Sequence, residues 1–502
     1  MDLFFDLFAI CIQNLNNMNS AKVDDTTYFA SPYWNIIKWI TRTIKRYTFR
    51  YGDVDKETKK FEDFATHWTN KYSGAYWDRL VEVLNNRKVI RIPDPIVVVC
   101  ISIIFNLFDN DVVMARDQTV LDSLVLDTMI DIMKFTKEEE SLFYDNPVEY
   151  FRKNDENNTN FGPAGQALNV FGKAFKRKKY LKSFMKFVNQ GLASKVNPRT
   201  QQPIGVIDIE AYFHIIENHS VAIARIKDCS VVITGLLQNY VMPELSSEHG
   251  FMRMRACKMV SSYASSMLGA DLLKSLSDGV VKCLADKDLP VRSCAAQAFE
   301  TLLKKKELRD YFLPNLKELL SVYVKLINEF ENDTLIASLK GIFEMYSDVI
   351  GPYAIELTKN LADLFFKCLD KEQKAQEAED DTSEMEKEVM ESGFACQSCI
   401  IAIEEILRSN VDNTILPQIY EIVEPMLAYG FSNEGLDFLS EISGILNMLI
   451  YNLDPLPNAI WGYYVIICYA MMGKPEGVAP NFPDYVTPKI KEIFNNMPND
   501  VN

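Results

Sequence analysis

Four histidines and one Cys-x-x-Cys pair are the first candidates for catalysis or metal binding in this sequence, because imidazoles and thiolates are common metal ligands and nucleophiles of enzymes. The histidines do not stand at metal-site spacing from each other or from a cysteine; they are His67, His214, His219 and His249. Cys396 and Cys399 lie in the helical sequence FACQSCIIAIEEIL without a second such pair, so we expect two core cysteines. Motifs for phosphate cradles, dinucleotides, zinc proteases and nucleophile elbows are absent from the sequence. We therefore predict that the chain is not an enzyme and uses no cofactor or metal.

An acidic tract is the most distinctive charged segment. Residues 370–392, DKEQKAQEAEDDTSEMEKEVMES, include ten acidic and three basic side chains and no aromatic one. Such a tract creates a local negative potential that can speed the capture of a basic ligand. A solvated loop that only increases solubility explains the same composition. The residues by themselves leave both interpretations open.

A basic run, KAFKRKKYLK over residues 173–182, has the composition of a nuclear localisation signal or an anion-binding patch. Its aromatic side chains could also stack on bases. However, Phe175, Tyr180 and Leu181 follow the spacing of one helix face, with lysines on the other side. We favour a solvated helix face with a buried apolar side.

Composition limits the possible partners and location. The formal net charge of -16 and the isoelectric point near 4.9 disfavour binding to a phosphate backbone and favour basic protein partners. Ten dispersed cysteines indicate buried thiols in a reducing compartment. The first residues lack the basic region of a secretory signal, and the apolar runs 95–108 and 461–473 are too short to span a bilayer. We expect an intracellular protein that is not inserted in membranes.

The elements that carry these residues are predicted to be helices, because apolar residues recur at helical spacing almost everywhere and alternating strand patterns are nearly absent. Similar stretches start at His249, Lys287 and Asn332. Arg255 and Arg292 lie 37 positions apart, near the period of HEAT or armadillo units. We predict an all-α, armadillo-like HEAT-repeat solenoid. Its expected parts are repeats over 1–369, an acidic loop insertion over 370–392, repeats over 393–495 and a disordered tail over 496–502.

Six segments resemble, in the same order, elements of importin 7/8-type receptors of the importin-β (karyopherin-β) superfamily. They are SPYWNIIKWITRTIKRYTFRYGD, with Trp34 and Trp39 beside basic residues, SLFYDNPVEYFRKN, SSEHGFMRMRACKMV, KDLPVRSCAAQAFETLL, FENDTLIASLKGIFEMYSDVIGPYAIELTKNLA and YNLDPLPNAIW. The resemblance extends over nearly the whole chain. It implies a superhelical receptor that carries protein cargo through the nuclear pore and releases it when Ran in its GTP form binds.

The same resemblance suggests partners and a site. Receptors of this family bind phenylalanine-glycine nucleoporins and basic cargo such as ribosomal proteins and histones, and they shuttle between cytoplasm and nucleus through the nuclear envelope. The acidic tract matches the position of an acidic loop in these receptors, which implies cargo binding by the side chains of Glu377, Glu379, Asp380, Asp381 and Glu384. The family's main Ran-binding surface precedes the position with which Met1 aligns. No Ran-contacting residue is therefore assigned.

Two alternatives belong to other classes. A HEAT-repeat scaffold or regulatory subunit would have the same fold without binding nucleoporins. An enzyme with an unfamiliar helical site would show turnover that a single substitution abolishes.

Overall fold

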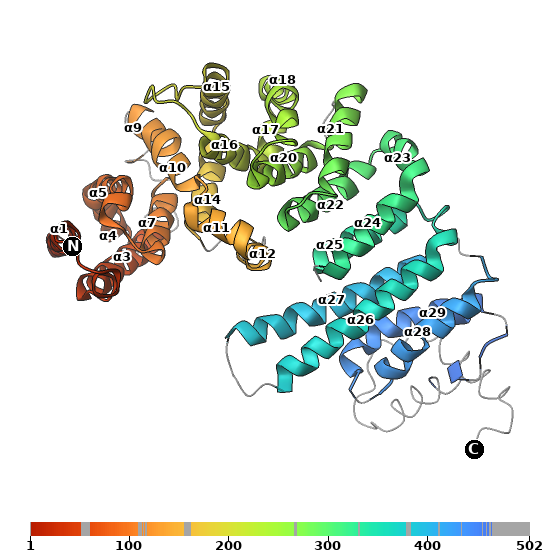
Figure 1. The fold of residues 1–502 in the computed structure, drawn as a ribbon. Coiled ribbons are helices and arrows are strands. Elements are labelled where there is room, and N and C mark those ends of the chain that lie inside the picture. The colour runs from red at the N-terminus through yellow and green to blue at the C-terminus, as the bar shows by residue number, and fades with distance from the viewer. Residues whose placement is uncertain are drawn as a thin grey trace. The chain divides into compact units, whose positions relative to one another are not determined.

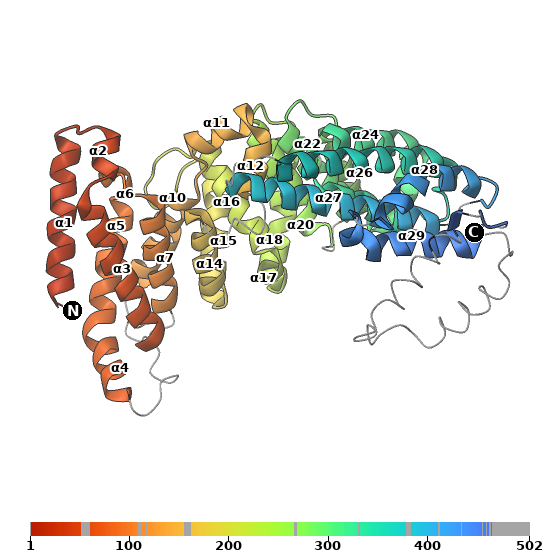
Figure 2. The ribbon, with the colours of Figure 1, turned by 90° about the horizontal axis from the view of Figure 1, so that it is seen from below.

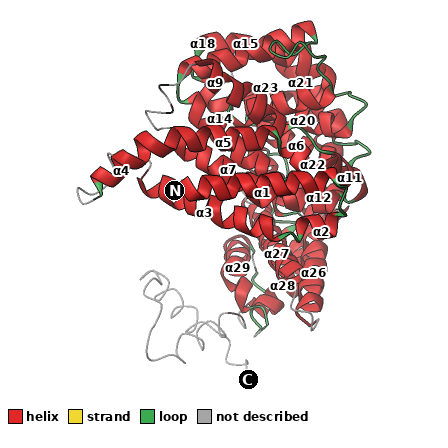
Figure 3. Cartoon of the chain, turned by 90° about the vertical axis from the view of Figure 1, so that its left-hand side faces the viewer, coloured by secondary structure: helices red, strands yellow, loops and turns green. Residues whose placement is uncertain are grey.

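The computed structural model describes residues 2–51, 61–108, 113, 115, 118–154, 162–265, 269–329, 332–377, 383–409, 412–432, 434–453, 455–457, 459–460 and 463. Over these residues the elements are helices joined by loops, with no strand (Figures 1 and 3). Among these residues, Val196 and Pro203 also form an isolated antiparallel β-bridge. The prediction of an all-α fold is confirmed. Among the described helices, none is both long enough and apolar enough to span a membrane.

The chain divides into two compact units, residues 1–326 and 327–502. The first part of unit 1 contains these helices: α1 (Asp2–Ser20), α2 (Asp25–Phe29), α3 (Pro32–Tyr51), α4 (Glu62–Trp68), α5 (Gly74–Asn85), α6 (Arg87–Ile90), α7 (Asp94–Leu107), α9 (Gln118–Ser123), α10 (Ile130–Met133), α11 (Lys137–Asp145) and α12 (Pro147–Asn154). π-Helical turns over Thr69–Ser73 and Leu124–Met129 join α4 to α5 and α9 to α10.

The rest of unit 1 continues in the same way. Its helices are α14 (Pro163–Phe175), α15 (Lys178–Ser194), α16 (Val206–Asn218), α17 (Ser220–Ala224), α18 (Lys227–Leu236), α19 (Met242–Glu244), α20 (Gly250–Tyr263), α21 (Ala270–Cys283), α22 (Leu289–Leu303) and α23 (Lys306–Phe312), and α24 (Leu316–Glu329) extends past residue 326. Unit 2 contains α25 (Asp333–Met345), α26 (Ala354–Glu377), α27 (Ser383–Arg408), α28 (Leu416–Gly430) and α29 (Leu439–Asn452).

Helices of unit 1 pack in successive layers, each on a helix a few elements further along the chain. α1 lies against α3, α3 against α7, and α7 against α14 (Figures 1 and 2). Further along, α16 packs on α20 and α20 on α22. Small side chains allow the last pair to approach closely, since Ala295, Ala296 and Ala298 of α22 are fully buried. Each layer thus buries its apolar side against the next, as in helical repeat proteins.

The helix starts fix the repeat register more sharply than the sequence spacing does. His249 and Asp288 directly precede α20 and α22 and lie 39 positions apart. Arg253 and Arg292 therefore occupy the same helical position, and Nη1 of each donates to two carbonyls of the preceding loop. The comparison of Arg255 with Arg292 was wrong in register by two residues. The cause is that the sequence MRMRAC offers two arginines, and only helix geometry shows which one reaches the loop.

Candidate binding surfaces

The acidic tract is carried by the hairpin of α26 and α27 in unit 2. The two helices pack against each other along their length, and the tract lies at the end where α26 stops and α27 begins (Figure 1). The expected loop over 370–392 is helical on both sides, because α26 continues to Glu377 and α27 starts at Ser383. The backbone of Glu377 and Glu384 is thus helical, whereas their side chains are not described. Glu379, Asp380 and Asp381 lie outside the described residues, as does the expected tail over 496–502.

Apolar packing holds the base of this hairpin. Phe365 of α26 is fully buried and makes an edge contact with Phe438, with ring centroids 5.7 Å apart. Cys396 and Cys399 of α27 are fully buried, and the Cys396 thiol donates to the carbonyl of Phe365 at 3.6 Å. A hydrogen bond with the thiol of Cys368, and then burial, raise the pKa of Cys396. Both residues are core cysteines, as predicted.

Charged groups at the base of the hairpin are partly compensated. Lys374 pairs with Asp370 one helical turn earlier at 2.6 Å, and both side chains are exposed. Burial, and next the charge of Asp437, raise the pKa of Glu372. Any concentrated negative charge of the hairpin must therefore come from the residues beyond this base.

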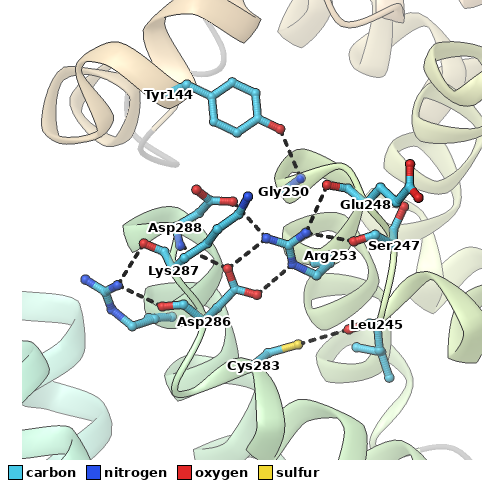
Figure 4. A network of polar contacts seen from close by, with 11 residues as sticks. Tyr144, Leu245, Ser247, Glu248, Gly250, Arg253, Cys283, Asp286, Lys287 and Asp288 are labelled. Carbon is cyan, nitrogen blue, oxygen red and sulfur yellow. Dashed lines mark hydrogen bonds and ion pairs between the residues drawn. The ribbon is translucent and has the colours of Figure 1, made fainter.

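Arg253 links α20 to the loop before α22 through several hydrogen bonds and ion pairs (Figure 4). Arg253 Nε and Nη2 donate to the two carboxylate oxygens of Asp286 at 2.6 and 2.8 Å, and Nη2 also donates to Asp288 at 2.8 Å. Nη1 donates to the carbonyls of Ser247 and Glu248 at 2.7 and 3.3 Å. All five N–H groups of the guanidinium are thus used. The hydrogen bond to Asp286, opposed by burial, raises the pKa of Arg253.

The start of α20 lies unusually close to this cluster. The N–H of Gly250 donates to the hydroxyl of Tyr144 in α11 at 3.0 Å (Figure 4). A Cβ at Gly250 would lie 2.3 Å from Asp288 Oδ2 and 2.9 Å from Phe143 Cε1. Only glycine fits between the aspartate and the aromatic ring.

A second buried arginine joins α20 to α16. Arg255 Nε donates to Glu210 at 2.7 Å, and Nη1 donates to Glu217. Burial opposes the charge of Arg255, but the two carboxylates raise its pKa above the ordinary value. All three side chains are largely buried, so the group works as a structural link between α16 and α20. Over the described residues no cluster of three or more metal-ligating side chains occurs.

The basic run over 173–182 forms the end of α14 and the start of α15. Phe175, Tyr180 and Leu181 are buried as expected, whereas Lys176, Lys178, Lys179 and Lys182 are exposed. The prediction of a solvated face with a buried apolar side is confirmed. Lys173 differs from the others, because its Nζ donates to the carbonyl of Phe105 at 2.5 Å and lies over that ring.

A pocket of about 410 Å³ lies beside Lys173, between α7 and α14 and next to His219. Burial lowers the pKa of His219 to about 4, so the imidazole is neutral near pH 7. A Cβ at Gly172 would lie 3.3 Å from the imidazole ring, which shows how closely the histidine packs on α14. His219 is a packed core histidine, and no thiol or hydroxyl nucleophile lines this pocket.

Comparison with known proteins gives consistent results at two levels. No family model matches the sequence. The chain is 24% identical over 486 residues to an importin beta-like SAD2 homolog of Arabidopsis thaliana. This alignment covers 91% of the chain and 44% of the relative. It is 27% identical over 365 residues to a probable importin-7 homolog of Dictyostelium discoideum, covering 68% and 32%. With human importin-8 it shares 24% identity over 393 residues, covering 76% and 37%. The chain thus spans less than half the length of these relatives.

Solved structures share the fold. The receptor Lph2, described as a bidirectional nuclear transport receptor of S. cerevisiae, matches with a TM-score of 0.67 and 12% identity over 97% of this chain and 49% of its own. The exportin Cse1 in its cargo-free, cytoplasmic state matches with a TM-score of 0.62 and 14% identity over 96% and 50%. These are HEAT-repeat solenoids, so the predicted repeat class is confirmed. In sequence the chain is similar to importin 7/8-type receptors, and its fold is that of the HEAT-repeat solenoids of nuclear transport receptors.

Proposed function

We propose that the chain binds protein cargo and carries it through the nuclear pore in a Ran-dependent cycle. The observation that carries the proposal is the similarity to importin-type receptors over 91% of the chain. The homologues are transport receptors, a class of binding proteins and not of enzymes. The partners follow from this class: basic proteins such as ribosomal proteins and histones, phenylalanine-glycine nucleoporins, and Ran in its GTP form. The receptor would shuttle between cytoplasm and nucleus and pass the nuclear envelope.

The acidic tract is the proposed cargo contact. Ten carboxylates in residues 370–392 offer a dense negative charge, and the packed base of α26 and α27 gives that charge a fixed support. A basic cargo would be attracted over a distance of about one Debye length, roughly 8 to 10 Å at ordinary salt. Binding should therefore weaken steeply as salt increases.

A pull-down with the full chain tests the proposal. The baits are phenylalanine-glycine nucleoporin repeats, Ran loaded with a GTP analogue, and a basic ribosomal protein, each at low and at moderate salt. We expect capture of the nucleoporin repeats and salt-sensitive capture of the ribosomal protein. Failure of all three baits would leave a HEAT-repeat scaffold and refute transport, whereas failure of Ran alone would show cargo binding without Ran-driven release.

Two matched variants locate the cargo contact. The first replaces the five candidate carboxylates with amides: Glu377→Gln, Glu379→Gln, Asp380→Asn, Asp381→Asn and Glu384→Gln. The second removes five exposed carboxylates elsewhere and has the same net charge: Asp271→Asn, Glu307→Gln, Asp310→Asn, Glu318→Gln and Glu356→Gln. Loss of the ribosomal protein by the first variant only would support the tract. Equal loss in both would show that overall charge, and not the tract, attracts the cargo.

A further inference from the structure

One face of α3 is basic and aromatic in a chain that is acidic overall. The sequence of α3, PYWNIIKWITRTIKRYTFRY, contains no acidic residue. Its buried side consists of Trp34, Ile37, Ile40, Thr41, Ile44 and Thr48. The opposite side, here called the basic-aromatic face, exposes Lys38, Trp39, Arg42, Arg46, Phe49 and Arg50. The transport function proposed above does not explain this face.

The two aromatic side chains of this face are largely exposed to solvent. Trp39 is 62% exposed and Phe49 is 77% exposed. Leaving such large apolar surfaces in water is unfavourable, and exposed aromatic groups between charged residues are typical of binding surfaces. Trp34, the other tryptophan of this segment, is buried in the core, so the two tryptophans have different roles.

The cations of this face are not neutralised by carboxylates within the described part of the chain. Lys38, Arg42 and Arg46 make no ion pair with a described residue, whereas Arg91 and Arg199 of the same unit each pair with an aspartate. The guanidinium of Arg42 lies 5.8 Å from the Trp39 ring. Such stacking orients a guanidinium and leaves its N–H edge open to an acceptor.

Aromatic packing extends the face at the end of α3. Arg50 lies 5.5 Å from the Tyr51 ring and 5.6 Å from the Phe61 ring. Tyr51 and Phe64 of α4 contact edge to face at 4.8 Å. In Figures 2 and 3, α4 extends beyond the neighbouring helices α1 and α7, so this end of the face lies on a projection.

The spacing of the arginines defines the geometry of a ligand. Arg42, Arg46 and Arg50 follow each other at every fourth residue, which places them about 6 Å apart along the helix. Alternate residues of an extended peptide point to the same side and repeat at roughly 6.6 Å. Three carboxylates at alternate positions would therefore match the three guanidinium groups, and each pair can form two parallel hydrogen bonds.

From this match we infer that the basic-aromatic face of α3 binds an extended acidic segment of a partner protein. Carboxylates at alternate positions pair with Arg42, Arg46 and Arg50, and an aromatic side chain of the segment packs on Trp39. A short acidic peptide is favoured over a nucleic acid, because a chain with net charge -16 repels a long polyanion over most of its surface.

The test uses the full chain and fluorescence anisotropy. The probe is a fluorescein-labelled peptide in which one phenylalanine precedes three glutamates at alternate positions. Three comparison ligands are a peptide with the glutamates adjacent, a peptide with lysine in place of glutamate, and a single-stranded RNA of mixed sequence. We expect the alternating acidic peptide to bind best and its affinity to fall as salt increases.

Variants show whether the face is responsible. R42Q/R46Q should weaken binding by about tenfold, as expected for the loss of two exposed ion pairs. Trp39→Ala should weaken it by roughly fivefold through lost apolar contact. The control K178Q/K186Q removes two exposed lysines of α15, changes the net charge equally and should leave affinity unchanged. Circular dichroism confirms that each variant retains its helices.

Three results would overturn the inference. The first is equal binding of the acidic and lysine peptides, which indicates non-specific adhesion. The second is an equal effect of R42Q/R46Q and K178Q/K186Q, because overall charge would then explain the binding. The third is tighter binding of RNA that R42Q/R46Q abolishes, which would make the face a nucleic-acid site.

Discussion

Replacing Arg253 with alanine should loosen the contact between α20 and the loop before α22. The side chain is 10% exposed, and its five N–H groups bind Asp286, Asp288 and two loop carbonyls. Alanine removes all of these donors. It also leaves the two aspartates, whose side chains are 11% and 16% exposed, without the charge that they face.

The expected loss is large because the carboxylates remain. Breaking a buried ion pair by removing one partner costs about 3 to 5 kcal/mol, most of it from the uncompensated charge left behind. The lower end of this range applies here, since both aspartates retain some contact with water. A loss of about 3 kcal/mol corresponds to roughly a hundredfold change in an opening equilibrium.

Native-state hydrogen exchange measures this loss locally, which suits a repeat array whose parts can open separately. Amides of α20 and α22 should exchange roughly a hundredfold faster in Arg253→Ala, and amides of α26 and α27 in unit 2 should not change. Arg199→Ala is the matched control, because Arg199 binds Asp127 at 2.9 Å at a site where both side chains are about a third exposed. An exposed pair of this kind contributes only about 0.2 to 1 kcal/mol.

A rescue experiment separates lost charge compensation from lost packing. In Arg253→Ala/Asp286→Asn/Asp288→Asn the orphan charges are gone, so exchange in α20 and α22 should slow again toward the native rate. The reasoning is refuted if Arg253→Ala behaves like Arg199→Ala, or if the triple variant exchanges as fast as the single one. The second outcome would mean that the arginine acts through its aliphatic packing.

Further predictions concern close packing and pH. Gly250→Ala should destabilise unit 1 by about 1 to 3 kcal/mol, because the new Cβ meets Asp288 Oδ2 at 2.3 Å, whereas Gly269→Ala has no heavy atom within 4 Å and should be neutral in urea unfolding. The pKa of His219 is lowered to about 4 by burial, so the neutral form is favoured on folding. The contribution of His219 to the free energy of unfolding is complete above about pH 6.5. It is lost as pH falls toward 4, at about 1.4 kcal/mol per pH unit. His219→Phe should remove this part of the slope of stability against pH; an unchanged slope would contradict the assignment.

The fold class could be predicted from sequence because it depends on periodicity. Apolar residues at helical spacing place residues such as Leu302 and Phe343 in the core whatever their exact neighbours, and both are fully buried. The close packing of α22 on α20 depends on small side chains, since Ala295, Ala296 and Ala298 are fully buried. Cys396 and Cys399 were predicted as core residues because they lie in a helical sequence without a second Cys-x-x-Cys pair.

Pairwise contacts were not predictable in the same way. Nothing in the sequence distinguishes Arg253, which binds Asp286, from Arg255, which binds Glu210. The two arginines are two residues apart on α20, so they point to different neighbours, and only the packed layers determine which one each meets. The basic-aromatic face was missed for a related reason. Trp34 and Trp39 look alike in sequence, and their opposite burial follows from the orientation of α3 against α1 and α7.

Net charge alone does not identify every partner of this chain, because its charged groups are sorted by sign. The acidic residues of 370–392 and the basic residues of α3 lie in different units, and each set contains few or no opposite charges of its own. A solvated surface that only maintains solubility needs no such sorting, since mixed charges serve equally well. Sorted charge instead favours association with partners of opposite sign and raises the rate of encounter. Two ligands of opposite charge could therefore bind one chain, and lowering the salt concentration should strengthen both interactions although the chain itself is strongly acidic.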